Sequence, residues 1–300
     1  MKIIALTVRT LRVYQWAKNL LVFAAIIFAG ELLNTTAIIN SLLAFVSFCL
    51  AASSTYILND LIDIEKDRLH PEKSKRPIAN GEVSIHIAVV LSLVLAVLSL
   101  ILAYILGPGF IAILLVYVFL TVSYSLLWKR FFLVDVLILS LGFVTRAVAG
   151  AVAIHVVFSN WLIVCTLFLA LFLSLGKRRG ELLLLKDNAE NHRSVLVYYT
   201  IEYLDQLLLI VSAGALISFT IYTCSQEVVM RLHTDQLYLS LPFVIYGLFR
   251  YLYLVRYQGE GSDPTKVLLT DKPIAICVVL WALTNIGLIY GGKVFSSLHF

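Results

Sequence analysis

The residues best suited to chemistry lie in one acidic stretch, from Asn59 to Asp67. If this stretch continues the apolar helix before it, Asp60, Asp63 and Asp67 are spaced i, i+3 and i+7 and share one helix face. Carboxylates at this spacing repel one another and need a compensating cation. Oxygen ligands favour a hard ion such as Mg²⁺, which often bridges carboxylates to substrate phosphates. The spacing predicts a Mg²⁺ and phosphate site; the alternative is a solvated charged loop.

A basic run follows the acidic stretch within a few residues and contains Lys73, Lys75 and Arg76. A Mg²⁺-bound diphosphate presents phosphate oxygens that the metal does not cover, and arginine binds such oxygens in a bidentate way. We therefore expect Lys73 and Arg76 to bind substrate phosphate beside the metal. The alternative for these residues is an ordinary positive charge signal on the inner side of a membrane.

The composition indicates a membrane protein that crosses the bilayer several times. Of 300 residues, 61% are hydrophobic and only 14% are charged, which is too apolar for a typical soluble domain. The net charge of +5 does not indicate nucleic-acid binding, because the basic residues separate apolar segments and form no single stripe. The four cysteines lie in or at the end of apolar segments without metal-ligand spacing.

Taking about 20 apolar residues for each span, we predict an all-α chain with nine transmembrane helices in a single domain, residues 1–300. The predicted spans are residues 19–37, 38–58, 85–106, 109–128, 131–153, 159–176, 203–224, 236–256 and 273–292. Almost all of the 23 lysines and arginines fall between spans on one side. The positive-inside rule then places the N-terminus in the cytoplasm, the C-terminus outside, and the long connections 59–84, 177–202 and 257–272 on the cytoplasmic face.

Several ionisable residues near or inside the spans are further candidates. Asp135 and Arg146 lie within one predicted span, where charged groups are costly and usually functional. They are too far apart along the helix for a direct ion pair, about 16 Å. We expect Asp135 to join the polar site and Arg146 to bind substrate or to orient a helix through carbonyl groups. Lys129 is a candidate phosphate ligand at the cytoplasmic end of a span, where snorkelling lysines also occur. Lys18 lies at the entry of the first span beside Trp16, where its position alone indicates such a snorkelling lysine.

The third inner connection contains Gly259, Gly261, Ser262 and Asp263. Such a glycine-rich segment could cover a site, but no strand precedes it and it matches no phosphate-binding loop. We therefore predict a plain flexible connector.

The acidic stretch resembles the first aspartate-rich motif of the UbiA superfamily of intramembrane prenyltransferases. The wider pattern is similar to the decaprenyl-phosphate phosphoribosyltransferase branch of that superfamily. The motifs that carry this likeness are Gln15 to Asn19, His70-Pro71 through Arg76-Pro77-Ile78, Asn80-Gly81, and Lys177-Arg178 with Glu181-Leu182. The resemblance implies a UbiA-like helical bundle with cytoplasmic active-site loops and Mg²⁺ held by Asn59 and the three aspartates. It also implies substrate contacts from Lys177, Arg178 and Glu181 and makes Lys18 a candidate phosphate ligand.

One departure from the superfamily supports that branch. Aromatic prenyltransferases of the superfamily carry a second aspartate-rich motif after the sixth helix. Here that connection opens with Lys177, Arg178 and Arg179, and its acidic residues Asp187 and Glu190 have a different spacing. More positive charge and one acidic cluster suit a donor with more phosphate, such as phosphoribosyl diphosphate.

The resemblance therefore implies an enzyme of a cell inner membrane that transfers phosphoribose from phosphoribosyl diphosphate to a polyprenyl phosphate and contributes to building the cell envelope. Two alternatives remain open at this point. An aromatic prenyltransferase would use the same first motif, and a polytopic transporter would explain the composition, although it predicts more charges near the middle of the membrane.

Overall fold

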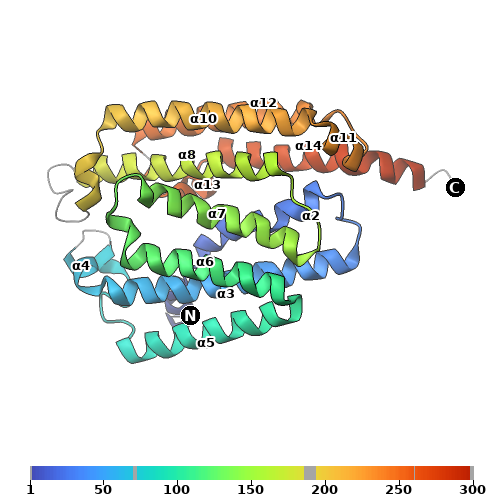
Figure 1. Cartoon of the computed structure of the whole chain (residues 1–300). Coiled ribbons are helices and arrows are strands. Elements are labelled where there is room, and N and C mark those ends of the chain that lie inside the picture. The colour runs from blue at the N-terminus through green and yellow to red at the C-terminus, as the bar shows by residue number, and fades with distance from the viewer. Residues whose placement is uncertain (1, 70–72, 186–193, 260, 298–300) are drawn as a thin grey trace.

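The computed structural model describes residues 2–69, 73–185, 194–259 and 261–297, and this part of the chain is helical, with no β-strand (Figure 1). The elements in chain order are α1 (Lys2–Leu11), η1 (Val13–Phe23), α2 (Ala24–Phe28), α3 (Thr35–Ile62), α4 (Ile64–Leu69), η2 (Lys73–Lys75), α5 (Ile85–Leu106), α6 (Pro108–Leu126), η3 (Trp128–Arg130), α7 (Val134–Ala153), α8 (Asn160–Leu185), η5 (Ser194–Tyr198), α10 (Ile201–Cys224), α11 (Gln226–Leu232), η6 (Leu237–Ser240), α12 (Leu241–Tyr253), η7 (Leu254–Gln258), α13 (Pro264–Thr270) and α14 (Lys272–Ser297).

In the described part of the chain, eight segments are long and apolar enough to cross a membrane. They are α3, α5, α6, α7, α8, α10, the run from η6 to η7, and α14, so the protein is a multi-pass membrane protein. The remaining predicted span, 19–37, differs from the structure. Its apolar residues form the shorter run η1 and α2, which ends at Phe28. The chain then turns at Gly30, whose φ of 77° suits glycine, and Asn34 caps α3 by accepting hydrogen bonds from the amides of Thr36 and Ala37.

Two reciprocal serine pairs join α3 to α5. The Ser47 hydroxyl donates to the Ser99 carbonyl at 3.0 Å, and the Ser99 hydroxyl donates back at 2.9 Å. Ser54 and Ser92 form the same arrangement. Small residues let helices approach closely in a membrane, and each hydroxyl here has a partner. The pairs fix the direction of α3, which carries the acidic stretch at its C-terminal end.

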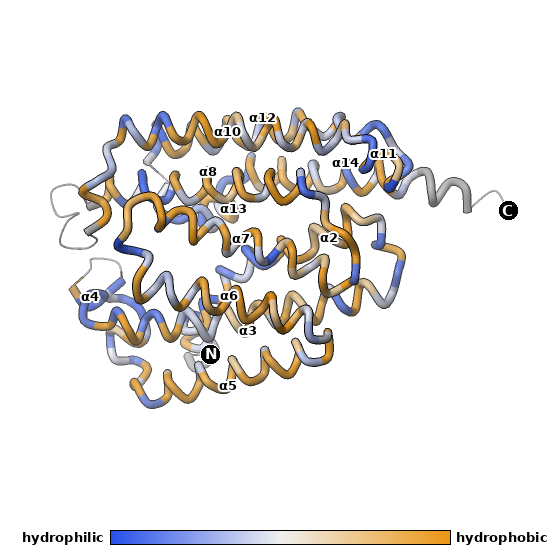
Figure 2. Tube along the Cα trace, in the orientation of Figure 1, coloured by the Kyte–Doolittle hydropathy of each residue, from blue (hydrophilic) through white to orange (hydrophobic). Residues whose placement is uncertain are grey.

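The polar segments gather at the two ends of the bundle. The long helices lie side by side, with α4 at one end and α11 and the C-terminal part of α14 at the other (Figure 1). Hydrophilic residues mark α4 and neighbouring turns, whereas the helices between the two ends are mostly hydrophobic (Figure 2). Lys129 of η3 reaches Asp63, and Gln15 of η1 reaches Asp263 beside α13. Connections distant in sequence therefore meet at the α4 end.

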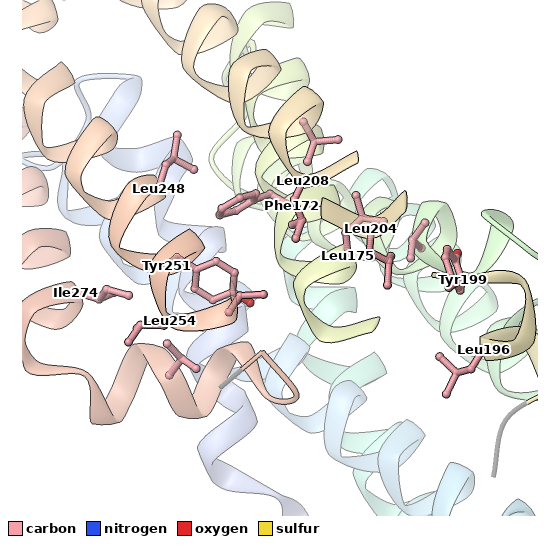
Figure 3. Packing of buried hydrophobic residues seen from close by; sticks show 14 of the residues in the cluster. Phe172, Leu175, Leu196, Tyr199, Leu204, Leu208, Leu248, Tyr251, Leu254 and Ile274 are labelled. Carbon is pink, nitrogen blue, oxygen red and sulfur yellow. The ribbon is translucent and has the colours of Figure 1, made fainter. Parts of the chain in front are cut away.

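The largest apolar core joins α8, α10 and α12 near that end. Phe172 and Leu175 of α8 pack with Leu204 of α10 and with Tyr251 and Leu254 (Figure 3). The rings of Phe172 and Tyr251 are 5.1 Å apart. This packing holds the last turns of α8 in place, and those turns contain Lys177 and Arg178.

Candidate active site

The turn between α1 and η1 brings an arginine to the acidic stretch. Arg12 has a φ of 51°, a left-handed conformation that is unusual for a residue other than glycine. Ser53 of α3 holds this turn by donating to the Leu11 carbonyl at 2.8 Å and accepting from the Trp16 indole at 3.0 Å. The Arg12 guanidinium forms an ion pair with Asp60. Backbone strain concentrates at functional sites, so this arrangement marks Arg12 as a candidate site residue.

Arg76 connects two carboxylates of the acidic stretch. Its Nη1 lies 3.0 Å from Asp60 Oδ1 and also pairs with Asp67. The side chains of Asp60 and Asp67 are 7% and 4% exposed, so both charges need a partner. Burial raises the pKa of Asp67, which the nearby cations Arg76 and Lys73 oppose. Asp60 and Asp67 therefore converge on one cationic nitrogen.

The third carboxylate faces a different cation. Lys129 Nζ donates to both carboxylate oxygens of Asp63, at 2.7 and 2.8 Å. The condition for a shared helix face, one continuous helix through this stretch, is not met, because α3 ends at Ile62, Asp63 is its C-cap, and α4 begins at Ile64. This break turns Asp63 toward η3. Within the described ranges, no group of three His, Cys, Asp or Glu side chains is placed to hold a metal ion.

Asn59 and Lys73 lie at the edge of this acidic cluster. Asn59 is half-buried, and its side chain forms no hydrogen bond with any residue that the structure describes. Lys73 of η2 is close enough to Asp67 for its positive charge to oppose the rise in the Asp67 pKa. Both are thus positioned to contact a ligand bound at Asp60, Asp63 and Asp67.

A buried ion-pair network surrounds Arg178 on α8. Arg178 Nε lies 2.6 Å from Asp135 Oδ2, and both side chains are completely buried. Arg178 also pairs with Glu181 and donates to the Tyr124 hydroxyl at 2.8 Å. Tyr199 donates to Asp135 at 2.8 Å, and burial together with that carboxylate raises the Tyr199 pKa. All the polar groups of Arg178 are engaged, so it positions Glu181 and Tyr124.

Lys177 and Lys18 lie beside that network and remain partly exposed. Lys177 Nζ is 4.0 Å from Glu181 Oε1, a loose pairing. Lys18 is within electrostatic reach of Lys177, Arg12 and Asp263. Two ammonium groups therefore face the same region from η1 and α8, an arrangement that suits an anionic ligand.

Arg146 lies deeper, between η1, α6 and α7. Its guanidinium donates to the Asn19 side chain at 2.7 Å, the Gly142 carbonyl at 2.6 Å and the Tyr117 hydroxyl at 3.0 Å. It also lies over the Tyr117 ring. As expected from its distance along the helix, Arg146 does not pair with Asp135. Its contacts join three elements, which fits the helix-orienting alternative.

Sequence reasoning missed several residues of this region. In the sequence, Arg12 is one of the basic residues that indicate topology, Tyr124 and Tyr199 belong to no functional pattern, and Asp263 lies in a segment predicted to be a plain connector. The left-handed turn and the pairings that reveal these residues depend on tertiary contacts, and no local pattern in the sequence indicates them. His70, Pro71, Asp187 and Glu190 lie outside the residues that the structure describes.

The carboxylates fit a hard divalent cation in chemistry and in part in geometry. Asp60 and Asp67 already share one positively charged group, Arg76, so a metal ion could replace it. Asp63 and the unpaired amide of Asn59 lie beside them and would complete an oxygen ligand set once Asp63 leaves Lys129. In the structure, the positive charges of Arg12, Arg76 and Lys129 compensate the negative charges of the three carboxylates.

These features define a class: a helical, multi-pass membrane protein with an acidic cluster and several cations at one end of its bundle. Within that class the chain belongs to the UbiA prenyltransferase family, whose sequence model matches residues 20–270.

Relatives and solved structures agree with this assignment. The chain is 33% identical to the decaprenyl-phosphate phosphoribosyltransferase of Corynebacterium glutamicum over 94% of its own length and 86% of the relative's. It is 32% identical to the enzyme of the same name from Mycolicibacterium smegmatis, over 94% and 92%. A UbiA homolog from Archaeoglobus fulgidus, solved bound to GPP and Mg²⁺, has a TM-score of 0.73 at 20% identity and covers 94% of this chain and 98% of its own. The chain is a transferase of this family, and its fold is the UbiA helical bundle.

Proposed function

We propose that this protein transfers 5-phosphoribose from phosphoribosyl diphosphate to a polyprenyl phosphate and releases diphosphate. The observation that carries the proposal is the unequal charge of the site. One acidic cluster lies at the end of α3, while α8 contributes Lys177 and the buried Arg178 at the position of a second acidic motif in aromatic prenyltransferases. The names of the relatives above, decaprenyl-phosphate phosphoribosyltransferase, support transfer of a phosphoribosyl group to a polyprenyl phosphate.

In the proposed reaction, a phosphate oxygen of the lipid attacks C1 of the ribose. The new bond joins C1 to that oxygen, the bond from C1 to the diphosphate oxygen breaks, and its electron pair leaves with diphosphate. A lipid phosphate is already ionised near neutral pH, so no general base is needed. The protein must position two anions and stabilise the leaving group.

Each side chain then has a role. Asn59, Asp60, Asp63 and Asp67 would hold Mg²⁺, which when bound would supply positive charge against the departing diphosphate. Arg12, Arg76, Lys73 and Lys129 lie close enough to these carboxylates to bind the phosphate oxygens that remain exposed. Lys18 and Lys177 bind the phosphates at the other side of the site. Asp135, Arg178 and Glu181 hold the end of α8, and Arg146 fixes η1 against α6 and α7.

The proposed function also requires one orientation of the protein in the membrane. The acidic end of the bundle lies at the cytoplasmic face of a cell inner membrane, with the N-terminus inside and the C-terminus outside. Phosphoribosyl diphosphate is a soluble metabolite, whereas the polyprenyl tail lies in the bilayer along the exposed apolar helices. Residues 1–300 act as one domain, and we propose no contact with nucleic acid.

The test uses purified protein in detergent with phosphoribosyl diphosphate labelled in the ribose, a polyprenyl phosphate and Mg²⁺. We expect label to enter the organic phase, and Asp60→Ala to abolish this transfer while the protein still elutes as a folded species. If no label becomes lipid-soluble and the protein instead consumes a prenyl diphosphate with an aromatic acid, the proposed function is wrong and the aromatic prenyltransferase reading replaces it.

A further inference from the structure

The third long connection, expected to be a plain connector, is packed tightly against α8. A Cβ built at Gly180 would overlap the Ser262 amide nitrogen, and one built at Gly261 would overlap the Gly176 carbonyl oxygen. Only glycine permits backbone segments to approach so closely. The connection is therefore held beside the last turns of α8, next to Lys177.

This packing brings Asp263 to the polar site. One of its oxygens, Oδ1, caps α13 by accepting from the amides of Thr265 at 3.1 Å and Lys266 at 3.3 Å. The other oxygen, Oδ2, has a single long contact, 3.5 Å from Gln15 Nε2. One carboxylate oxygen is thus nearly unused at a place where ligands can approach, since Asp263 is partly exposed.

Asp263 differs from the other carboxylates around the site. The structure gives each of the others at least one ion pair, and these are Asp60, Asp63, Asp67, Asp135 and Glu181. Asp263 forms no ion pair with any described residue. Its charge is balanced only at longer range, by the ammonium group of Lys18.

The 3₁₀-helix η1 links Asp263 to the acidic cluster. Three residues per turn place Gln15 and Lys18 on one face of η1, and Arg12 comes directly before its first residue. Arg12 contacts Asp60, while Gln15 contacts Asp263. Arg12, Gln15 and Lys18 thus form one row of polar residues. Asp60 and Asp263 contact this row one turn apart, about 6 Å at about 2 Å per residue.

The chemistry of this row indicates what Asp263 binds. A carboxylate beside cations that bind phosphate would repel a phosphate group, but it accepts hydrogen bonds well from hydroxyl groups. A donor bound through its diphosphate at Arg12 and Asp60 would extend its sugar along η1. A pentose offers two neighbouring hydroxyls as donors there.

We propose that Asp263, supported by Gln15, binds the 2- and 3-hydroxyls of the donor sugar and sets the preference for ribose over deoxyribose. The inference rests on the proposed function and names the subsite for the sugar within the same site. Asp263 is then a specificity-determining residue supplied by the third connection.

The experiment compares phosphoribosyl diphosphate with its 2-deoxy and 3-deoxy counterparts in wild type, Asp263→Asn and Asp271→Asn. Asparagine keeps the helix cap and nearly the same shape, so D263N should fold. Asp271 is a matched control, since it also caps a helix through the Ile274 amide but faces Arg250. We expect wild type and D271N to prefer the ribose donor by about 10- to 100-fold in kcat/KM, the range for a hydrogen bond to a charged group.

In D263N we expect this preference to fall below about 3-fold for at least one hydroxyl, with the KM for polyprenyl phosphate unchanged. The effects on kcat/KM of removing the carboxylate and of removing that hydroxyl should then be non-additive. A D263N enzyme that slows equally on all three donors, or that keeps the wild-type preference, overturns the inference and leaves the proposed function standing. A wild type that transfers nothing from phosphoribosyl diphosphate overturns both.

Discussion

Asp135 of α7 and Arg178 of α8 form an ion pair that is completely buried, with 2.6 Å between Oδ2 and Nε. The residues are 43 positions apart in the chain, and the pair joins two helices at the end of the bundle where the polar site lies. Tyr199 and Tyr124 complete the hydrogen bonds of the two charges. The pair thereby places Lys177, the residue directly before Arg178 on α8, at the edge of the site.

Asp135→Asn should destabilise the protein, because it leaves the Arg178 charge buried with one partner fewer. Breaking a buried pair in this way typically costs about 3–5 kcal/mol. The measurement is thermal unfolding of purified protein in detergent. The double variant Asp135→Leu with Arg178→Met should lose less stability than the sum of the losses in Asp135→Leu alone and Arg178→Met alone. Strict additivity would show that the two charges do not depend on each other.

Arg12→Ala should weaken binding of the donor and leave the fold intact. Asp60 keeps Arg76 at 3.0 Å when Arg12 is removed, so its buried charge stays compensated. We expect the KM for phosphoribosyl diphosphate to rise by about 10-fold, as for loss of one charged hydrogen bond. The matched control is Arg9→Ala, since Arg9 is exposed and pairs with Glu82 at the surface. Equal effects of the two variants would assign Arg12 to topology alone.

Asp63→Asn should lower the transfer rate by at least about 100-fold and raise the Mg²⁺ concentration needed for half of the remaining activity. Asparagine removes the charge that a metal requires but nearly preserves the shape. Glu65→Gln is the control, because Glu65 is exposed and pairs with Arg68 one turn away. The measurement is the transfer rate of each variant across a series of Mg²⁺ concentrations. Elution profiles show whether each variant is folded. A D63N enzyme with the wild-type rate would remove Asp63 from the metal site.

The sequence predicted the spans well because hydropathy is a property of each segment alone, and eight of the predicted segments are long apolar helices in the structure. It also selected Asp60, Asp63 and Asp67, which lie together at one end. The partners of these carboxylates could not be predicted in the same way. Lys129 reaches Asp63 across 66 positions, and such a contact depends on how α6 packs and not on any periodic pattern.

The turn at Arg12 and the packing of the third connection against α8 could not be predicted either, because both depend on contacts between distant parts of the chain. Arg12 lies among other N-terminal basic residues, and its left-handed turn is held by Ser53, which belongs to another helix. Gly180 and Gly261 are far apart in sequence, and only the folded chain shows that each lacks a side chain because the other backbone segment passes there. Glycine in a connection is also typical of flexibility, so the sequence favoured the wrong interpretation of that segment.

The ion pair between Arg250 and Asp271 should make stability depend on acidity. The hydrogen bond from Arg250 lowers the pKa of Asp271 below its usual value of about 4. A carboxyl whose pKa is lower in the folded state stabilises the protein above the unfolded pKa and loses that contribution as pH falls through the folded pKa. The difference in unfolding temperature between wild type and Asp271→Asn should therefore be largest near pH 6 and shrink below about pH 4. A difference that does not change with pH would show that the charge is not responsible.

Gly261→Ala should displace the third connection from α8 and reduce transfer activity. The added methyl group would overlap the Gly176 carbonyl oxygen, which is backbone and cannot move aside as a side chain can. Asp263 and Gln15 would then separate, so we expect the KM for the donor to rise by about 10-fold or more, with a smaller effect on unfolding temperature. Gly287→Ala in α14 is the control: no atom lies within 4 Å of the added Cβ, and alanine in a helix should stabilise it by about 0.5–1 kcal/mol. Unchanged donor kinetics in G261A would show that the close contact between this connection and α8 does not position the site.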